Sequence, residues 1–92
     1  MERATIFLTE YLKYRLGLRG YDLDKVEEIL RFTTERYIDS VTRRKVAIGK
    51  HGKNMVMIPY EIEGEVITPI TIHATCRQQI NARIKSGRLI NE

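Results

Sequence analysis

The strongest constraint on the fold of this chain is a period-two pattern of apolar residues in its second half. From Val56 to Ile62 every even-numbered position is apolar, so Val56, Ile58, Tyr60 and Ile62 share one face of a strand. A period of two over this length is typical of a strand with one buried face. The chain must therefore form a sheet and supply other elements to cover that face.

Neighbouring segments extend this pattern into an antiparallel meander. We predict strands over residues 35–41, 43–50, 53–62 and 65–74, with turns at Lys50–Lys53 and Glu63–Glu65. Pairing Ile58 with Ile70, and Val56 with Ile72, keeps the buried face uniform. That face is expected to consist of Val56, Ile58, Tyr60, Ile62, Val66, Ile70 and Ile72. Pro59 and Pro69 imply a bulge, an edge or a short break.

Helical periodicity flanks the predicted sheet on both sides. A short strand at 4–8 is followed by predicted helices over 9–18 and 23–32, the second capped by Asp22. Their apolar stripes are Leu8, Tyr11, Leu12 and Leu16, and Leu23, Val26, Ile29 and Leu30. A last helix begins near Cys76, where Thr75 and Gln78 have capping-box spacing.

These elements predict a single α+β domain over residues 1–92. Its architecture is an N-terminal helical hairpin packed on a three- to four-stranded antiparallel sheet, followed by a C-terminal helix. No apolar run reaches the roughly 18 residues that span a bilayer, and the N-terminus lacks a long apolar signal segment. The single cysteine, Cys76, fits a reducing compartment. We therefore expect a cytoplasmic protein without membrane contact.

Charge is distributed unevenly along the chain. Residues 1–42 hold seven Lys/Arg and eight Asp/Glu, whereas residues 43–92 hold nine Lys/Arg and four acids, a balance of +5. Such asymmetry predicts a polyanionic partner for the second half, and a basic surface kept for solubility is the alternative.

The junction between the last strand and the last helix is the richest candidate site. If Ile70 and Ile72 face the core, Thr71 and His73 face the other side, just before a helix N-terminus that suits a phosphate. Arg77, in the first helical turn, could clamp the same anion. In the alternative interpretation, His73 is an ordinary surface residue and Arg77 pairs with a glutamate.

Two basic clusters are candidates for binding nucleic acid, although solvated loop charges are the alternative. They are Arg43, Arg44 and Lys45 at the start of a strand, and Lys50, His51 and Lys53 at a hairpin tip. A face opposite the helical hairpin could be lined by Lys45, Met55, Met57, Thr71 and His73. Such a face suits RNA or a partner helix, and equally the underside of the last helix. No phosphate loop, dinucleotide fingerprint or metal-spaced His/Cys set is present, so no cofactor or metal is expected.

Three stretches, together with the order of elements, carry a resemblance to a known family. They are Arg43–Lys50 (RRKVAIGK), Met55–Glu61 (MVMIPYE) and His73–Arg83 (HATCRQQINAR). With the helical hairpin they resemble the BrnT-like branch of the RelE/ParE toxin superfamily, the toxins of type II toxin–antitoxin pairs. The resemblance covers nearly the whole chain in element order.

The resemblance implies a metal-independent ribonuclease that cleaves messenger RNA, free or on the ribosome, and is inhibited by a cognate antitoxin. In such an enzyme the ribose 2′-hydroxyl attacks the adjacent phosphate. Carried over, Arg77 binds phosphate, His73 is the acid or base, and Arg83 supports them. Two alternatives stay open: a non-catalytic module that binds nucleic acid or protein, and a ParE-like inhibitor of a protein target such as gyrase. A homodimer and a toxin–antitoxin hetero-oligomer both remain open as assemblies.

Overall fold

The alternating segment forms the longest strand and the centre of the sheet. The structure, a computed structural model, describes residues 3–92, and within that range the fold is α+β with three helices and a mixed seven-stranded sheet. The helices are α1 (Glu10–Leu18), α2 (Leu23–Phe32) and α3 (Arg77–Lys85). The strands are β1 (Thr5–Ile6), β2 (Arg36–Asp39), β3 (Lys45–His51), β4 (Asn54–Glu63), β5 (Val66–Pro69), β6 (His73–Thr75) and β7 (Leu89–Asn91).

The sheet is larger than the sequence pattern predicted, and it is not purely antiparallel. The strand order is β1-β5-β4-β3-β2-β7, with β6 pairing the free end of β4. β1 runs parallel to β5, while every other pair is antiparallel. The expectation of three or four antiparallel strands is therefore wrong in two respects: β1 joins the sheet in parallel, and β7 adds an edge beyond β2.

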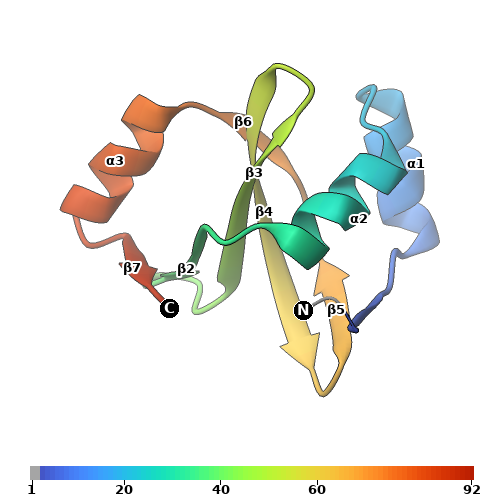
Figure 1. The fold of residues 1–92 in the computed structure, drawn as a ribbon, viewed down its shortest axis with the longest axis horizontal. Helices are drawn as coiled ribbons and strands as arrows, with labels where there is room; N and C mark the ends of the chain where they lie inside the picture. Colours follow the sequence, from blue (N-terminus) through green and yellow to red (C-terminus); the bar gives the residue numbers. More distant parts are fainter. Residues whose placement is uncertain (1–2) are drawn as a thin grey trace.

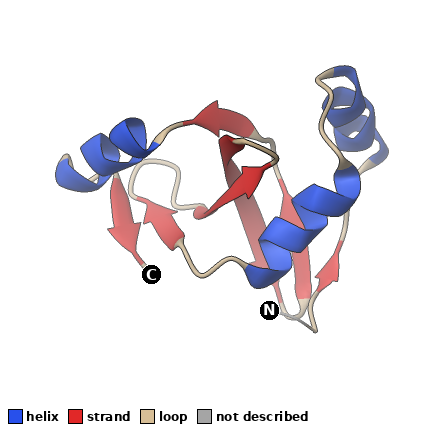
Figure 2. Cartoon of the chain, turned by 45° about the horizontal axis from the view of Figure 1, so that its top comes forward, coloured by secondary structure: helices blue, strands red, loops and turns tan. Residues whose placement is uncertain are grey.

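Apolar side chains fill both faces of the sheet. One cluster joins Leu12 and Leu16 of α1 and Val26 and Leu30 of α2 to the predicted buried face of β4. The other cluster lies on the opposite face and contains Tyr37, Val46, Ile48, Met57, Ile80 and Leu89. Figures 1 and 2 show the corresponding arrangement, with α3 at one end of the molecule, α1 and α2 at the other, and the strands between them.

The pairing on β4 differs from the predicted register by one residue along β5 and, after a bulge between β5 and β6, by two along β6. Tyr60 pairs with Pro69, but Met57 pairs with His73. The three residues 70–72 therefore lie opposite only two residues of β4, Ile58 and Pro59. Ile72 joins the core as predicted, although Val56 pairs with Ala74 and the predicted pairings of Val56 with Ile72 and Ile58 with Ile70 are wrong. Ile70 instead lines a pocket on the other face, and Val66 is 42% exposed because Ile67 takes the core position. The break that the prolines predicted is thus confirmed, and the placement of Val66 and Ile70 was wrong.

The helices begin close to where the sequence placed them. Thr9 caps α1 by accepting the Leu12 amide hydrogen, and the Asp22 carboxylate accepts the amides of the first turn of α2. Cys76 is the N-cap of α3 and makes no side-chain capping bond, so the predicted capping box is absent and the Thr75 hydroxyl instead bonds Gln79. Within residues 3–92, no helix has the length and apolar character needed to cross a membrane.

Candidate functional site

A pocket of about 510 Å³ lies on the α3 face of the sheet. Met57 and Pro59 of β4 lie on one side of it, and α3 contributes Gln79 and Arg83. The remaining lining residues come from the β5–β6 segment, the β2–β3 turn and the start of β7: Asp39, Thr42, Arg44, Ile70, Thr71, His73, Ala74, Thr75 and Arg88. Three arginines and one histidine therefore meet one carboxylate around a single pocket.

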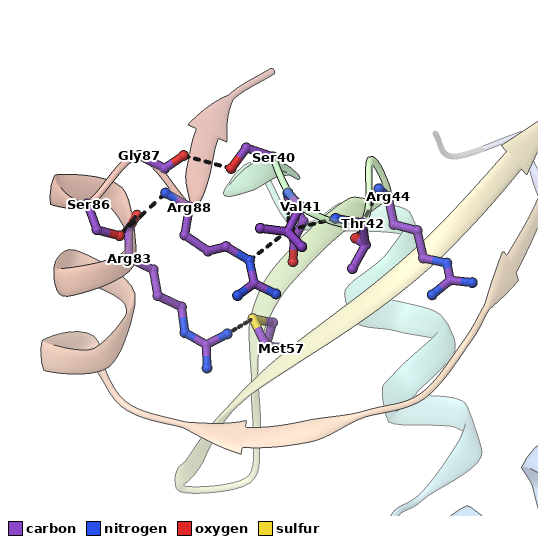
Figure 3. A network of polar contacts seen from close by, with 10 residues as sticks. Ser40, Val41, Thr42, Arg44, Met57, Arg83, Ser86, Gly87 and Arg88 are labelled. Carbon is purple, nitrogen blue, oxygen red and sulfur yellow. Dashed lines mark hydrogen bonds and ion pairs between the residues drawn. The ribbon is translucent and has the colours of Figure 1, made fainter.

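Arg83 reaches into this pocket from the last turns of α3. Its Nη1 donates a hydrogen bond of 3.6 Å to the Met57 sulfur, which is a weak acceptor (Figure 3). Among residues 3–92 no carboxylate lies within ion-pair distance of Arg83. A guanidinium carries five N–H donors, so most of those on Arg83 are available to an anion.

Arg88 is held in place by the β2–β3 turn. Its Nε donates to Asp39 Oδ1 over 2.8 Å, and the same oxygen accepts the amide hydrogens of Val41 and Thr42. Ser40 closes the arrangement, since its hydroxyl donates to the Gly87 carbonyl and its amide to the Arg88 carbonyl (Figure 3). Because Asp39 accepts a hydrogen bond from Nε alone, the two Nη groups of Arg88 can donate to another acceptor.

The Asp39 carboxylate should make folding stability sensitive to acid. The Arg88 hydrogen bond, helped by the Thr42 and Val41 amides, lowers the pKa of Asp39 from 3.8 to about 2, and Asp39 is only 8% exposed. A depressed folded-state pKa stabilises the fold above pH 4, and this contribution is lost as the pH falls from about 4 to about 2. We expect roughly 2 kcal/mol to be lost over that window. Urea unfolding at pH 5, 4, 3 and 2.5 should show this loss in the wild type and a smaller one in Asp39→Asn. An equal loss of unfolding free energy with falling pH in the two proteins would contradict this role of Asp39.

His73 lies at the rim of the pocket, paired with Met57 across the β4–β6 ladder. Desolvation by its surroundings lowers the pKa of His73 below its ordinary 6.5, and the positive charges of Arg19 and Arg83 lower it further. The imidazole is therefore neutral at neutral pH and can accept a proton. His73 thus occupies the position expected from the sequence, on the face opposite Ile72 and open to solvent.

Arg77 does not belong to this pocket. Its two Nη groups donate to the two Glu35 carboxylate oxygens at 2.6 and 2.7 Å, and Tyr37 donates its hydroxyl to the same carboxylate. This bidentate pair ties the start of α3 to the segment before β2. The expected juxtaposition of His73 and Arg77 around one anion is replaced by the glutamate pairing that the sequence left as the alternative.

The two predicted basic clusters are divided by the fold. Arg44 lines the pocket, with a loose contact of 3.5 Å to Glu61. Lys45 lies on the other face, paired with Tyr60 in the ladder, and donates to the Glu92 carboxylate over 2.8 Å. His51 Nε2 accepts the Asp22 amide hydrogen, and its ring packs edge-on against Tyr21.

The three remaining cations of these clusters lie outside the pocket. Arg43 adopts a φ of 66° in the β2–β3 turn, and Arg43, Lys50 and Lys53 are exposed. No ion pair involving these three side chains is present in the described part of the chain. Only Arg44 of the six predicted nucleic-acid-binding residues therefore joins His73 and Arg83.

Sequence reasoning missed Arg88 and Asp39 as site residues. Their pairing depends on β7, which lies next to β2. The apolar pair Leu89–Ile90 after Gly87 was the available sign that the chain continues as a strand. A three-residue strand is too short for periodicity to identify it, so the position of Arg88 in the pocket could not be predicted from the pattern alone.

Comparisons with protein-family models, with curated proteins and with solved structures found no match for this chain. The site must therefore be interpreted from its own chemistry. Within residues 3–92 no group of three or more His, Cys, Asp or Glu side chains could hold a metal ion. The pocket offers arginine donors, one neutral imidazole and the polar side chains of Thr71, Thr75 and Gln79. Those groups suit a phosphate, which accepts several charge-assisted hydrogen bonds at once.

Proposed function

We propose that this chain binds RNA through the pocket on its α3 face and cleaves it without a metal ion. The observation that carries the proposal is the convergence of Arg44, Arg83 and Arg88 on one pocket that also holds His73. Guanidinium groups around a single opening suit a phosphodiester, and the basic second half of the chain suits the flanking phosphates.

The proposed reaction uses His73 as the general base. Its neutral imidazole takes the proton of a ribose 2′-hydroxyl, whose oxygen forms a bond to the adjacent phosphorus. The bond from phosphorus to the 5′-oxygen breaks, leaving a 2′,3′-cyclic phosphate and a 5′-hydroxyl that takes its proton from solvent. Arg83 and Arg88 stabilise the charge that develops on the phosphate oxygens.

The biological role that we propose is that of the toxin in a type II toxin–antitoxin pair, acting in the cytoplasm and neutralised by a cognate antitoxin. Support comes from the three stretches that resemble the BrnT-like branch of the RelE/ParE superfamily and from the α+β fold. The sheet has helix-derived residues packed on both faces. The non-catalytic binding module and the ParE-like inhibitor remain the competing functions.

Replacing His73 with alanine should slow cleavage strongly and leave binding intact. We expect the rate to fall by about 10²–10⁴-fold, because the proton acceptor is lost. In the wild type kcat/KM should fall as the pH drops through a value below 6.5, because desolvation and the nearby arginines lower the pKa of His73 and the protonated imidazole cannot act as base. Cleavage of a labelled single-stranded RNA in the presence of EDTA measures both effects.

Arg77→Ala is the control for this experiment, because Arg77 is bonded to Glu35 and does not line the pocket. It should cleave as the wild type does. Inducing each protein alone and sequencing cellular RNA ends separates the candidate functions. New 5′-hydroxyl ends that depend on His73 support the ribonuclease. RNA binding without cleavage indicates the module, and growth arrest with intact RNA indicates the ParE-like inhibitor.

A further inference from the structure

The side of α1 that points away from the core carries a strip of large exposed side chains. Tyr11, Tyr14 and Leu18 are 68%, 65% and 68% exposed. They follow one another at intervals of three and four residues, so they lie on one side of the helix. Leu12 and Leu16 take the buried side of the same helix. The sequence had assigned Tyr11 to the core, and the structure places it in this strip.

Single exposed apolar residues are ordinary, but an aligned set marks an interaction surface. Tyrosine combines a large apolar ring with a hydroxyl and is enriched at the centres of protein interfaces. Phe7, three residues before the start of α1, is also 54% exposed. Helices pack on one another through side chains three, four and seven residues apart, and Tyr11, Tyr14 and Leu18 have this spacing on α1.

Two arginines beside the strip indicate the charge of the partner. Arg15 Nη1 donates to the Tyr11 hydroxyl over 2.9 Å, and its guanidinium lies 5.7 Å from the Tyr11 ring centroid. Arg19 lies 5.7 Å from the Tyr21 ring centroid. Within residues 3–92 neither arginine pairs with a carboxylate, whereas Glu10 on the same helix is already paired with Lys13. The strip is therefore bordered by positive charge that the described chain does not neutralise.

We propose that this face of α1 docks an acidic amphipathic helix of a different protein. The apolar side of that helix covers Tyr11, Tyr14 and Leu18, and its flanking carboxylates pair with Arg15 and Arg19. A second copy of this chain fits less well, because it brings the same arginines to the interface and like charges oppose one another. The surface lies on α1, which contributes no residue to the pocket of the proposed RNA site, so this inference does not depend on that function.

The probe for this proposal is a synthetic acidic helix of about 18 residues, with leucines three and four positions apart and glutamates on either side of them. Its matched control is the same peptide with every glutamate replaced by lysine. Fluorescence anisotropy of the labelled peptides is measured against the wild type, Tyr14→Ser/Leu18→Ser, Arg15→Gln and Phe32→Ser. Phe32 is 58% exposed on α2, so its variant removes an exposed apolar side chain outside the strip.

The acidic peptide should bind the wild type with a Kd below about 100 μM, and the double variant should weaken this at least roughly tenfold. Arg15→Gln should weaken binding and reduce its salt dependence, and Phe32→Ser should bind as the wild type does. The Arg83→Gln protein should also bind the peptide normally, whatever happens to its RNA binding.

Several results would overturn the proposal. They are the absence of saturable binding up to about 1 mM peptide, equal binding of the lysine peptide, and an equal loss in Phe32→Ser. Weaker RNA binding by the double variant, without peptide binding by the wild type, would assign the strip to nucleic acid. Concentration-dependent dimerisation of the wild type that the double variant abolishes would assign it to a second copy.

Discussion

Arg83→Gln is expected to lower RNA cleavage by about 10²–10³-fold, the usual cost of losing one donor to a charged transition state. Arg83 is the pocket arginine that no carboxylate within residues 3–92 engages. Its guanidinium can therefore turn to a phosphate without breaking an ion pair. RNA affinity should also fall, and the log–log slope of affinity against salt should become shallower by about 1.

Lys85→Gln supplies the matched control for this prediction. Lys85 lies on the same helix, carries the same charge and does not line the pocket. The two variants change net charge equally, so they differ only in where the charge is removed. Thermal melting should show both to be folded, because within residues 3–92 the Arg83 side chain makes one hydrogen bond, to the Met57 sulfur. If Lys85→Gln loses as much affinity and activity as Arg83→Gln, the pocket has no special role and the binding is diffuse.

Gly49→Ala should lower the free energy of unfolding by about 1–3 kcal/mol, although alanine suits a strand better than glycine. A Cβ at Gly49 would lie 2.5 Å from Ile29 Cγ2 and 3.0 Å from Ile29 Cγ1. Ile29 is β-branched and lies within α2, so its χ1 angle cannot rotate freely away from the contact. At this distance steric overlap outweighs strand propensity. For a domain of this size the melting temperature should fall by about 4–8 °C for each kcal/mol lost.

Gly17→Ala in α1 tests the same substitution where space is available. Apart from the neighbouring residues and the backbone of α1 itself, no atom of the described chain lies within 4 Å of a Cβ built at Gly17. We therefore expect this change to stabilise the fold by about 0.5–1 kcal/mol through helix propensity. Combining Gly49→Ala with Ile29→Ala should relieve the overlap and give a coupling energy of about 0.5–3 kcal/mol. A stabilising Gly49→Ala would mean that α2 does not pack this closely on β3.

Local patterns predicted the elements well because each depends on neighbouring residues. The helix over 23–32 and its Asp22 cap were predicted from capping chemistry and periodicity, and both are confirmed. The buried face of β4 was likewise predicted from alternation alone. Thr71 and His73 lie on the opposite face as predicted, but alternation from Ile67 and Pro69 would have turned them inward, and it is the bulge that restores their outward facing.

Features that depend on distant residues could not be predicted in the same way. The β4–β5 hairpin pairs Ile62 with Ile67, one residue off the predicted register, and this turns Val66 and Ile70 out of the core. The bulge at residues 70–72 then returns Ile72 to the core, and Pro69 indicated only that some interruption would occur. Arg77 has suitable chemistry for a phosphate, but Glu35, far away in sequence, comes to lie beside it. Arg88 enters the site only because β7 lies next to β2.

The way the sheet edges are closed bears on the order in which the protein folds. β3 and β4 form a hairpin between neighbours in sequence, whereas β7 pairs residue 89 with residue 39, and β1 pairs residue 5 with residue 66. Closing such long loops costs entropy before any contact is gained, so these edges form after the hairpin. β7 has three residues and only one neighbouring strand, so its opening should need less free energy than global unfolding. Arg88 separates from Asp39 when that edge opens, and Leu89 leaves the cluster on the α3 face. The chain then passes through states that keep the core between α1, α2 and the sheet but have lost the pocket.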